Sequence, residues 1–233
     1  VISSSPNPSV VGQPISITAT VTPKGAATGT PDGVVQFLVD GTSLGFVTLE
    51  DGTASIPTSD LARGAHDVKA VYLSADPNFV TSASAVQTHT VNKAATDTTL
   101  TSSSPVAVWG QPVTFTAEVA VVAPGAGSPS GTVTFLDGST VLGTVDVSSA
   151  TGGVATITVE DLTVGQHAVE ATYDGDASFQ GSTASIAQKV QRAQTSTVLV
   201  SSANPATSIS LCPTPTVSTS TTSHPAASST RSA

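Results

Sequence analysis

The sequence predicts an all-β chain of two antiparallel β-sandwiches in tandem, and two observations predict it. The first is a motif, Leu-x-x-Gly-x-His-x-Val-x-Ala-x-Tyr, which occurs at 61–72 and again at 162–173. The second is an apolar side chain at every second position of the flanking segments, the period of a strand with one buried face. His66 and His167 lie 101 residues apart (167 − 66). This is the size of a small β-domain, so we expect a repeat array.

The composition favours strands and argues against two classes of partner. Only 10% of residues are charged and methionine is absent, while Ser, Thr, Val, Ala and Gly suit pleated strands better than helices. We therefore expect no substantial helix. The formal charge of −9 argues against nucleic acid, because phosphate binding needs clustered Lys and Arg. It argues equally against electrostatic attachment to anionic membranes.

The context of the chain is indicated by its start and by its single cysteine. Val1-Ile2 does not begin a signal peptide, and no apolar run is long enough to span a bilayer. We therefore expect no membrane insertion, and an excerpt of a longer protein whose targeting signals lie elsewhere. Cys212 lies outside both repeats, so each sandwich must be held together by packing, without a disulfide.

Recurring landmarks predict the boundaries. Gly12-Gln13-Pro14 matches Gly110-Gln111-Pro112, and each repeat ends on a similar tetrapeptide, at 91–94 and 190–193. We assign residues 1–92 to repeat 1 and residues 93–191 to repeat 2. Residues 192–207 resemble the start of an incomplete third repeat. Residues 208–233 are rich in Ser and Thr and are expected to be disordered, either as a natural mucin-like tail or as an altered reading frame.

Strands are predicted at matching places in the two repeats. Residues 15–21 and 113–119 alternate between apolar and mostly hydroxyl side chains, as in a strand that covers a core on one side. The next strands carry two apolar residues each and end at Asp-Gly, a tight-turn signal. A Leu-Gly pair in the return strand predicts a large side chain beside a close backbone approach. These features lie at Val35, Phe37, Asp40-Gly41 and Leu44-Gly45, and at Val133, Phe135, Asp137-Gly138 and Leu142-Gly143.

Further strands are expected at 52–57 and 153–159, over the histidine motifs, and at 81–91 and 182–190. About seven short strands per repeat, with turns between them and no crossover helices, are typical of a sandwich. Together, the Gly-Gln-Pro, Val-x-Phe and Leu-Gly pairs, the histidine motif and the segment 174–179 resemble bacterial immunoglobulin-like repeats of secreted and cell-surface proteins. The resemblance covers residues 1 to 191. It implies two tandem immunoglobulin-like sandwiches.

His66 and His167 are the most conspicuous candidates for chemistry. Catalysis would require a nucleophile or carboxylate positioned beside each ring. Asp67 follows His66, but adjacent strand residues point to opposite faces, and repeat 2 has Ala168 there. We therefore predict that each histidine bonds backbone across the turn that precedes its strand.

The aromatic residues are assigned mainly to packing. Tyr72 and Tyr173 share a face with their histidine and are predicted at the edge of the core. Trp109 replaces Val11 of repeat 1 just before Gly-Gln-Pro, at the end expected to face a following domain. Interdomain packing is the favoured role of Trp109, and a lone carbohydrate-stacking site is the alternative.

Asp174-Gly175-Asp176 invites a calcium interpretation, with Asp97 expected nearby. The segment is not an EF-hand, because Ser185 stands where a bidentate Glu is required. An ordinary solvated turn is the favoured reading, and a junction ion is the alternative.

No residue is assigned to catalysis, to a metal or to a cofactor, because the sequence contains no phosphate loop, catalytic carboxylate pair or nucleophile elbow. We predict a non-catalytic, monomeric spacer of a secreted or cell-surface protein. Its short connectors, at 92–97 and 191–195, would restrict the angles between domains. The alternative is an adhesin or a carbohydrate- or protein-binding module that uses the loop at 23–33 or at 124–131, or an exposed edge strand.

Overall fold

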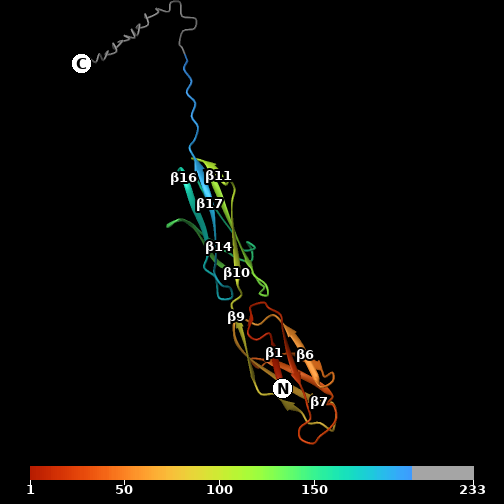
Figure 1. Cartoon of the computed structure of the whole chain (residues 1–233). Helices are drawn as coiled ribbons and strands as arrows, with labels where there is room; N and C mark the ends of the chain where they lie inside the picture. The colour runs from red at the N-terminus through yellow and green to blue at the C-terminus, as the bar shows by residue number, and fades with distance from the viewer. Residues whose placement is uncertain (201–233) are drawn as a thin grey trace, which may run out of the picture. The chain divides into compact units, whose positions relative to one another are not determined.

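Strands are the only regular elements that the computed structural model places in residues 1–200, the part of the chain that it describes (Figure 1). That part contains no helix long and apolar enough to cross a membrane. The all-β prediction is confirmed. Cys212 and the predicted tail lie outside the described residues.

Repeat 1 is a sandwich of two sheets. One sheet has the strand order β1-β3-β6, and the other has the order β2-β9-β7-β4-β5, with the short β8 added to β7. The strands are β1 (Ile2–Ser5), β2 (Ser9–Val10), β3 (Ile15–Thr20), β4 (Gly33–Val39), β5 (Thr42–Thr48), β6 (Thr53–Thr58), β7 (Gly64–Ser74), β8 (Ser82–Ala83) and β9 (Gln87–Asn92).

Repeat 2 has the same topology. Its sheets have the orders β10-β12-β15 and β11-β17-β16-β13-β14. The strands are β10 (Thr96–Ser102), β11 (Val106–Val108), β12 (Val113–Val121), β13 (Gly131–Asp137), β14 (Thr140–Val147), β15 (Val154–Val159), β16 (Gly165–Tyr173) and β17 (Ser182–Gln191). Two packed sheets joined in this order, antiparallel except where β2 meets β9 and β11 meets β17, form an immunoglobulin-like sandwich, as the resemblance implied.

The first strand of each repeat is divided between the two sheets. β1 pairs antiparallel with β3, whereas β2 pairs parallel with β9 in the other sheet. The crossing falls at Pro6 and Pro8 in repeat 1 and at Pro105 in repeat 2. Proline donates no hydrogen bond to a ladder, so pairing stops there and the chain can change sheets.

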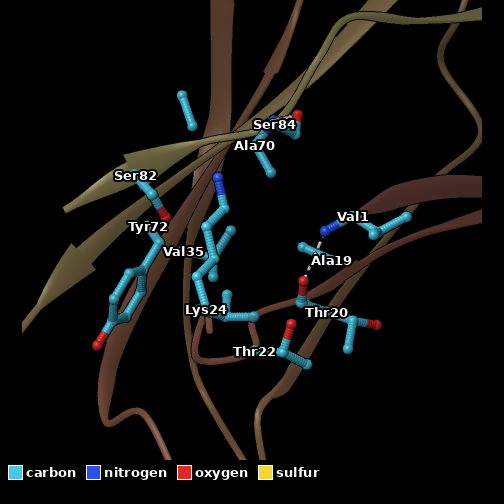
Figure 2. A pocket seen from close by; sticks show the side chains of 12 residues that line it. Val1, Ala19, Thr20, Thr22, Lys24, Val35, Ala70, Tyr72, Ser82 and Ser84 are labelled. Carbon is cyan, nitrogen blue, oxygen red and sulfur yellow. Dashed lines mark hydrogen bonds between the residues drawn. The ribbon is translucent and has the colours of Figure 1, made fainter. Parts of the chain in front are cut away.

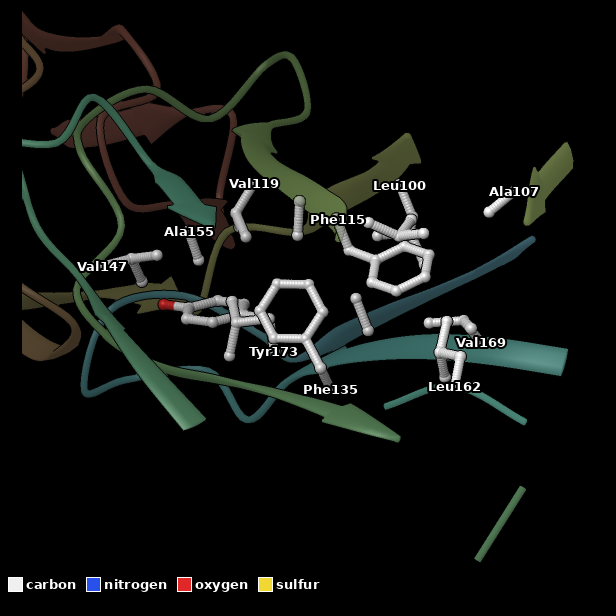
Figure 3. Packing of buried hydrophobic residues seen from close by; sticks show 14 of the residues in the cluster. Leu100, Ala107, Phe115, Val119, Phe135, Val147, Ala155, Leu162, Val169 and Tyr173 are labelled. Carbon is white, nitrogen blue, oxygen red and sulfur yellow. The ribbon is translucent and has the colours of Figure 1, made fainter. Parts of the chain in front are cut away.

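Each sandwich has its own core, built from the predicted alternation. In β12, Val113, Phe115, Ala117 and Val119 are buried in turn. Phe115 and Val119 face Phe135 and Tyr173 from the opposite sheet (Figure 3). Alternate residues of a strand point to one face, so local patterning alone places this set inside.

Two of the predicted turn features are present. Asp40 and Gly41 join β4 to β5 with φ of 51° and 79°, both in the left-handed region that a two-residue hairpin turn requires. The Leu-Gly pair also approaches its neighbour closely. A Cβ built on Gly143 would lie 2.5 Å from Ile157 Cδ1, and one built on Gly45 would lie 3.3 Å from Ile56 Cδ1.

The structure corrects one strand. The segment 81–91 is not continuous, because β8 pairs with β7 only at Ser82 and Ala83, and the strand resumes at Gln87. Ser84 takes the place of a ladder partner there: its hydroxyl accepts a hydrogen bond from Ala70 N at 3.0 Å. Repeat 2 keeps β17 unbroken from Ser182 to Gln191. Residues 192–200 form no strand, and the proposed third repeat stays a prediction.

Candidate functional site

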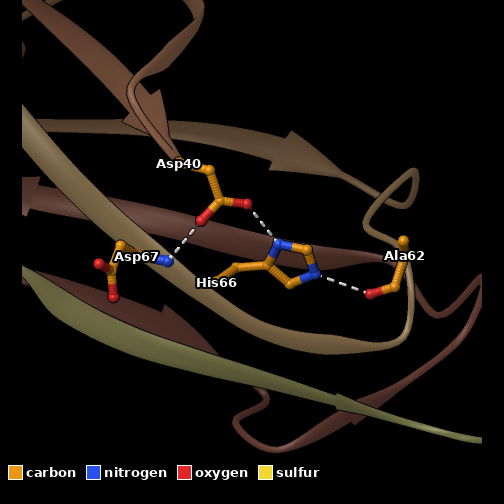
Figure 4. Close-up of polar contacts among 4 residues, drawn as sticks. All are labelled: Asp40, Ala62, His66 and Asp67. Carbon is orange, nitrogen blue, oxygen red and sulfur yellow. Dashed lines mark hydrogen bonds and ion pairs between the residues drawn. The ribbon is translucent and has the colours of Figure 1, made fainter.

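His66, near the start of β7, bridges two parts of repeat 1 (Figure 4). Its Nδ1 lies 2.7 Å from Asp40 Oδ2, and its Nε2 lies 2.7 Å from the carbonyl oxygen of Ala62. The other oxygen of Asp40 accepts a hydrogen bond from Asp67 N at 2.8 Å. The ring therefore ties the loop before β7 to the hairpin turn between β4 and β5.

Repeat 2 contains the same corner. His167 Nδ1 lies 2.6 Å from Asp137 Oδ2, and Nε2 lies 2.8 Å from the carbonyl oxygen of Thr163. The prediction that each histidine bonds backbone across its turn is confirmed. The aspartate was missed: Asp40-Gly41 and Asp137-Gly138 were recognised as turns, and that recurrence was the available signal for a paired side chain.

The partners of these rings favour the imidazolium form. A carbonyl oxygen and a carboxylate are both acceptors, so both ring nitrogens must carry a proton to make both bonds. The bond to Ala62 and then the bond to Asp40 raise the pKa of His66. Partial burial lowers the pKa of His167, but the bonds to Thr163 and Asp137 outweigh it and raise the pKa. The bond from His66 lowers the pKa of Asp40.

This geometry is unsuited to general-base catalysis. A base must present a lone pair to the proton that it removes. In each corner, Nε2 points at a main-chain carbonyl and Nδ1 at a carboxylate, and neither nitrogen faces a hydroxyl or thiol. The corners therefore serve as structural ties between a loop and a hairpin.

Two buried polar residues were not singled out from the sequence. His89 of β9 is fully buried, with Ser4 Oγ 2.9 Å from Nδ1 and Ser9 Oγ 2.8 Å from Nε2. Gln188 of β17 is also fully buried; its Oε1 accepts a bond from Ser102 Oγ at 2.6 Å, and its Nε2 donates to Ser104 O at 2.8 Å. Hydroxyl partners can donate or accept, so they satisfy a neutral imidazole. Burial lowers the pKa of His89.

Both tyrosines belong to the cores, buried more deeply than the core edge at which they were predicted. Tyr72 and Tyr173 are 3% and 1% exposed. The hydroxyl of Tyr72 donates to Asp32 O at 2.5 Å, and that of Tyr173 donates to Ser130 O at 2.6 Å. Burial, with the nearby charge of Asp176, raises the pKa of Tyr173 to about 12.

Asp176 organises its own loop. One carboxylate oxygen accepts bonds from the amides of Ser178 and Phe179, both at 2.7 Å. The other oxygen accepts bonds from the amide and hydroxyl of Ser130, at 2.9 and 2.6 Å. These donors use the lone pairs that a cation would need. Across residues 1–200, no group of three or more His, Cys, Asp or Glu side chains is arranged to hold a metal ion.

The loop around Asp176 holds the connector between the repeats. Ala94 N donates to Ser178 O at 3.0 Å, Gln180 N donates to Ala94 O at 2.9 Å, and Lys93 Nζ donates to Asp176 O. Ala94 is fully buried in the core of repeat 2. The connector is therefore built into the second sandwich.

A second contact joins the repeats, which belong to one unit, Val1–Ala193. Val11 packs against the core of repeat 2, and its carbonyl accepts a bond from Ala126 N at 3.1 Å. Gly12 has φ of +74°, and a Cβ there would lie 2.2 Å from Ala126 O. The loop at 124–131, a candidate binding loop from the sequence, is thus partly used by this contact.

A hollow of about 200 Å³ opens in repeat 1 beside Val1, Ala19, Tyr72 and Ser82 (Figure 2). The first strand of repeat 2 extends further at the corresponding position. β10 begins four residues (100 − 96) before Leu100, which pairs with Ala117 as Ile2 pairs with Ala19. The hydroxyls of Thr96 and Thr98, in that extra length, both bond Ser182 Oγ, at 2.8 and 2.7 Å.

These observations define a class: a tandem β-sandwich protein whose repeated polar residues tie its own loops together. The chain belongs to the bacterial Ig-like domain (group 3) family, whose model matches residues 2–92 and 99–191. No curated protein sequence matches the chain.

Three solved structures illustrate what the chain is similar to. The fibronectin(III)-like modules of Clostridium thermocellum CbhA are 22% identical, with 86% of this chain and 100% of that chain covered and a TM-score of 0.36. A 1.5-MDa bacterial ice-binding adhesin is 16% identical, with 82% and 64% covered and a TM-score of 0.32. The Yersinia pseudotuberculosis adhesin InvE is 15% identical, with 81% and 58% covered and a TM-score of 0.40.

Proposed function

We propose that the chain is a non-catalytic spacer or stalk module of a larger secreted or cell-surface bacterial protein. In this role it holds a neighbouring domain of the same protein at a distance and limits the angle between domains. The observation that carries the proposal is the junction between the repeats, where the connector residues are bonded into the sandwich of repeat 2.

The connector leaves little chain to act as a hinge. Lys93 and Ala94 are bonded to the 176–180 loop, and Thr96 Oγ1 donates to Gln180 O at 2.8 Å. A flexible linker keeps its backbone solvated and its ends independent. Here the backbone bonds are made to repeat 2, so the connector moves with that repeat and the chain free to act as a hinge shortens to the link between Asn92 and Lys93.

Packing at Val11 and Gly12 adds a second restraint at the same junction. The carbonyl of Val11 is bonded to Ala126, and Gly12 leaves no room for a side chain. Two separated points of contact resist bending better than one, which supports a stiff junction.

The experiment compares Gly12→Ala with Gly110→Ala. Both glycines are left-handed, with φ of +74° and +81°, so both changes carry the same backbone strain of about 1 kcal/mol. Only at Gly12 does the new Cβ meet another repeat, since nothing lies within 4 Å of a Cβ on Gly110. Backbone ¹⁵N relaxation would report the tumbling of each repeat.

We expect one shared tumbling time for the two repeats in the unchanged chain and in Gly110→Ala. In Gly12→Ala, each repeat should tumble faster and separately. Independent tumbling of the repeats in the unchanged chain would contradict the spacer proposal.

The alternative, an adhesin or a carbohydrate- or protein-binding module, rests on the loop at 23–33. With Tyr72 and Phe79, this loop lines a hollow of about 360 Å³ in repeat 1. A glycan array and pull-downs against extracellular matrix proteins test it. Saturable binding that disappears when the loop is replaced by Gly and Ser would favour this function over the spacer.

A further inference from the structure

The turn after β2 in repeat 1 has a counterpart after β11 in repeat 2. Val11 N donates to Asn92 O at 3.0 Å, and Trp109 N donates to Gln191 O at 2.8 Å. In each turn, a glutamine side chain accepts a bond from the amide three residues before it, at 3.0 Å for Gln13 and 3.1 Å for Gln111. The two turns therefore have the same backbone arrangement.

The surroundings of the two turns differ. Gly12 and Gln13 are half-buried, and Gly12 lies against Ala126 of the second sandwich, whereas Gly110 and Gln111 are exposed. Three apolar side chains at this end of repeat 2 are open to solvent: Val108 is 41%, Trp109 61% and Val164 46% exposed. They lie at one end of the same sheet, because β11 and β16 flank β17 and meet it at Gln191 and Val190 (Figure 1).

We propose that this end face, formed by Val108, Trp109 and Val164, docks a further immunoglobulin-like repeat. The incoming repeat would use its loop equivalent to 123–127, and its amide equivalent to Ala126 would bond the carbonyl of Trp109, as Ala126 bonds Val11. The inference rests on the spacer function proposed above and extends the same junction to the next position of an array.

The chemistry of the face fits a protein loop. At the existing junction, the partner of Val11 is a short loop of Pro, Gly and Ala, which presents main-chain amides and little side-chain bulk. Indole at the equivalent position covers more apolar area than valine and tolerates a partly wet contact. The neighbours of Trp109 on the face are aliphatic, and a sugar would need polar groups to orient it.

Trp109 is the one tryptophan of the sequence, so its fluorescence reports this face alone. A second copy of residues 96–194 is inserted between Gln194 and Thr195 of the full chain, with Trp109→Val in the inserted copy. The natural connector Arg192-Ala193-Gln194 then precedes the insert, as Lys93-Ala94-Ala95 precedes repeat 2. Emission and quenching by iodide are compared with those of the unextended chain, and thermal unfolding checks that the insert folds.

We expect a shift of emission to shorter wavelength and a loss of iodide quenching in the extended chain. Gly110→Ala in the original repeat should abolish both changes there, because its Cβ would meet the docked loop as one on Gly12 would. The same substitution should leave the emission of the unextended chain unaltered.

An unchanged spectrum with a folded insert would overturn the inference. An emission shift that persists in the extended chain with Gly110→Ala would also overturn it. A shift in the unextended chain on addition of xylan or cellulose oligosaccharides, with none on extension, would overturn it too. The relaxation experiment at Gly12 does not involve Trp109, so the spacer function and this docking face can fail separately.

Discussion

His89 in repeat 1 and Gln188 in repeat 2 hold the same place in their sheets. His89 pairs across the ladder with His66, and Gln188 pairs in the same way with His167. Each bonds the equivalent serine of the first strand, Ser4 or Ser102. The same buried position is therefore filled by a titratable side chain in repeat 1 and by a neutral one in repeat 2.

This difference predicts that acid destabilises repeat 1 more when His89 is present. Burial and the charge of His66 lower the pKa of His89 below the ordinary 6.5. The imidazole of His89 then binds a proton more readily in the unfolded chain than in the folded chain. The stability of repeat 1 is therefore lost as the pH falls below about 6.5. His89→Gln should reduce the loss of stability of repeat 1 between pH 7 and pH 5, measured by NMR-monitored thermal unfolding.

Gln188→His supplies the matched reverse change and should make repeat 2 newly sensitive to acid. If His89→Gln leaves the acid sensitivity of repeat 1 intact, His89 is not its source.

Removal of a corner histidine should destabilise its own repeat. His167→Phe loses the bonds to Asp137 and Thr163 and should cost about 1–3 kcal/mol of unfolding free energy. The pKa of His167 is raised, so its contribution is complete below about pH 6.5 and is lost as the pH rises through the folded pKa. The cost should therefore be larger at pH 5 than at pH 8. Gln166→Phe, at an exposed neighbour, is the control, and an unchanged melting temperature for His167→Phe would refute the structural role.

The hydroxyl of Tyr173 should ionise at a higher pH than that of an exposed tyrosine. Its pKa is raised to about 12, so the stability that it contributes is complete below about pH 10 and is lost as the pH rises through 12. In a Tyr72→Phe chain, absorbance at the phenolate band would follow Tyr173 alone, and we expect a midpoint near 12. A midpoint near 10 in the folded protein would contradict the burial and bonding described for this hydroxyl.

Gly143→Ala should destabilise repeat 2, because its Cβ would lie 2.5 Å from Ile157 Cδ1. Overpacking of this kind costs about 1–3 kcal/mol. Ile157→Val removes the clashing methyl group and should rescue part of the loss in the double variant. Chemical denaturation of the two single variants and the double variant measures the coupling, and simple additivity would show that the two side chains do not meet.

The strand pattern was predictable because it is local. The alternation in Val113 to Val119 determines which face of the strand is buried, and this does not depend on which strand pairs with it. The broken strand at Ser84 was not predictable in this way, since the bond that Ala70 N donates to the Ser84 hydroxyl joins residues 14 positions apart and depends on how β7 and β8 pair.

The partners of the corner histidines show the same difference between local and distant residues. The motif around His66 and His167 was enough to predict a bond across the preceding turn, because Ala62 and Thr163 lie four residues before their rings. The aspartates come from 26 and 30 residues away and reach the rings only through the pairing of neighbouring strands.

The sequence by itself determined that the chain forms two all-β sandwiches, because side-chain alternation and turn residues act over a few neighbouring positions. The tertiary structure alone decided that Asp40 and Asp137 complete the corners, that the connector at Ala94 belongs to repeat 2, and that Gly12 lies against Ala126. Each of these depends on which distant backbone atoms the sheet register and the packing bring within hydrogen-bonding distance, and a linear pattern does not specify that.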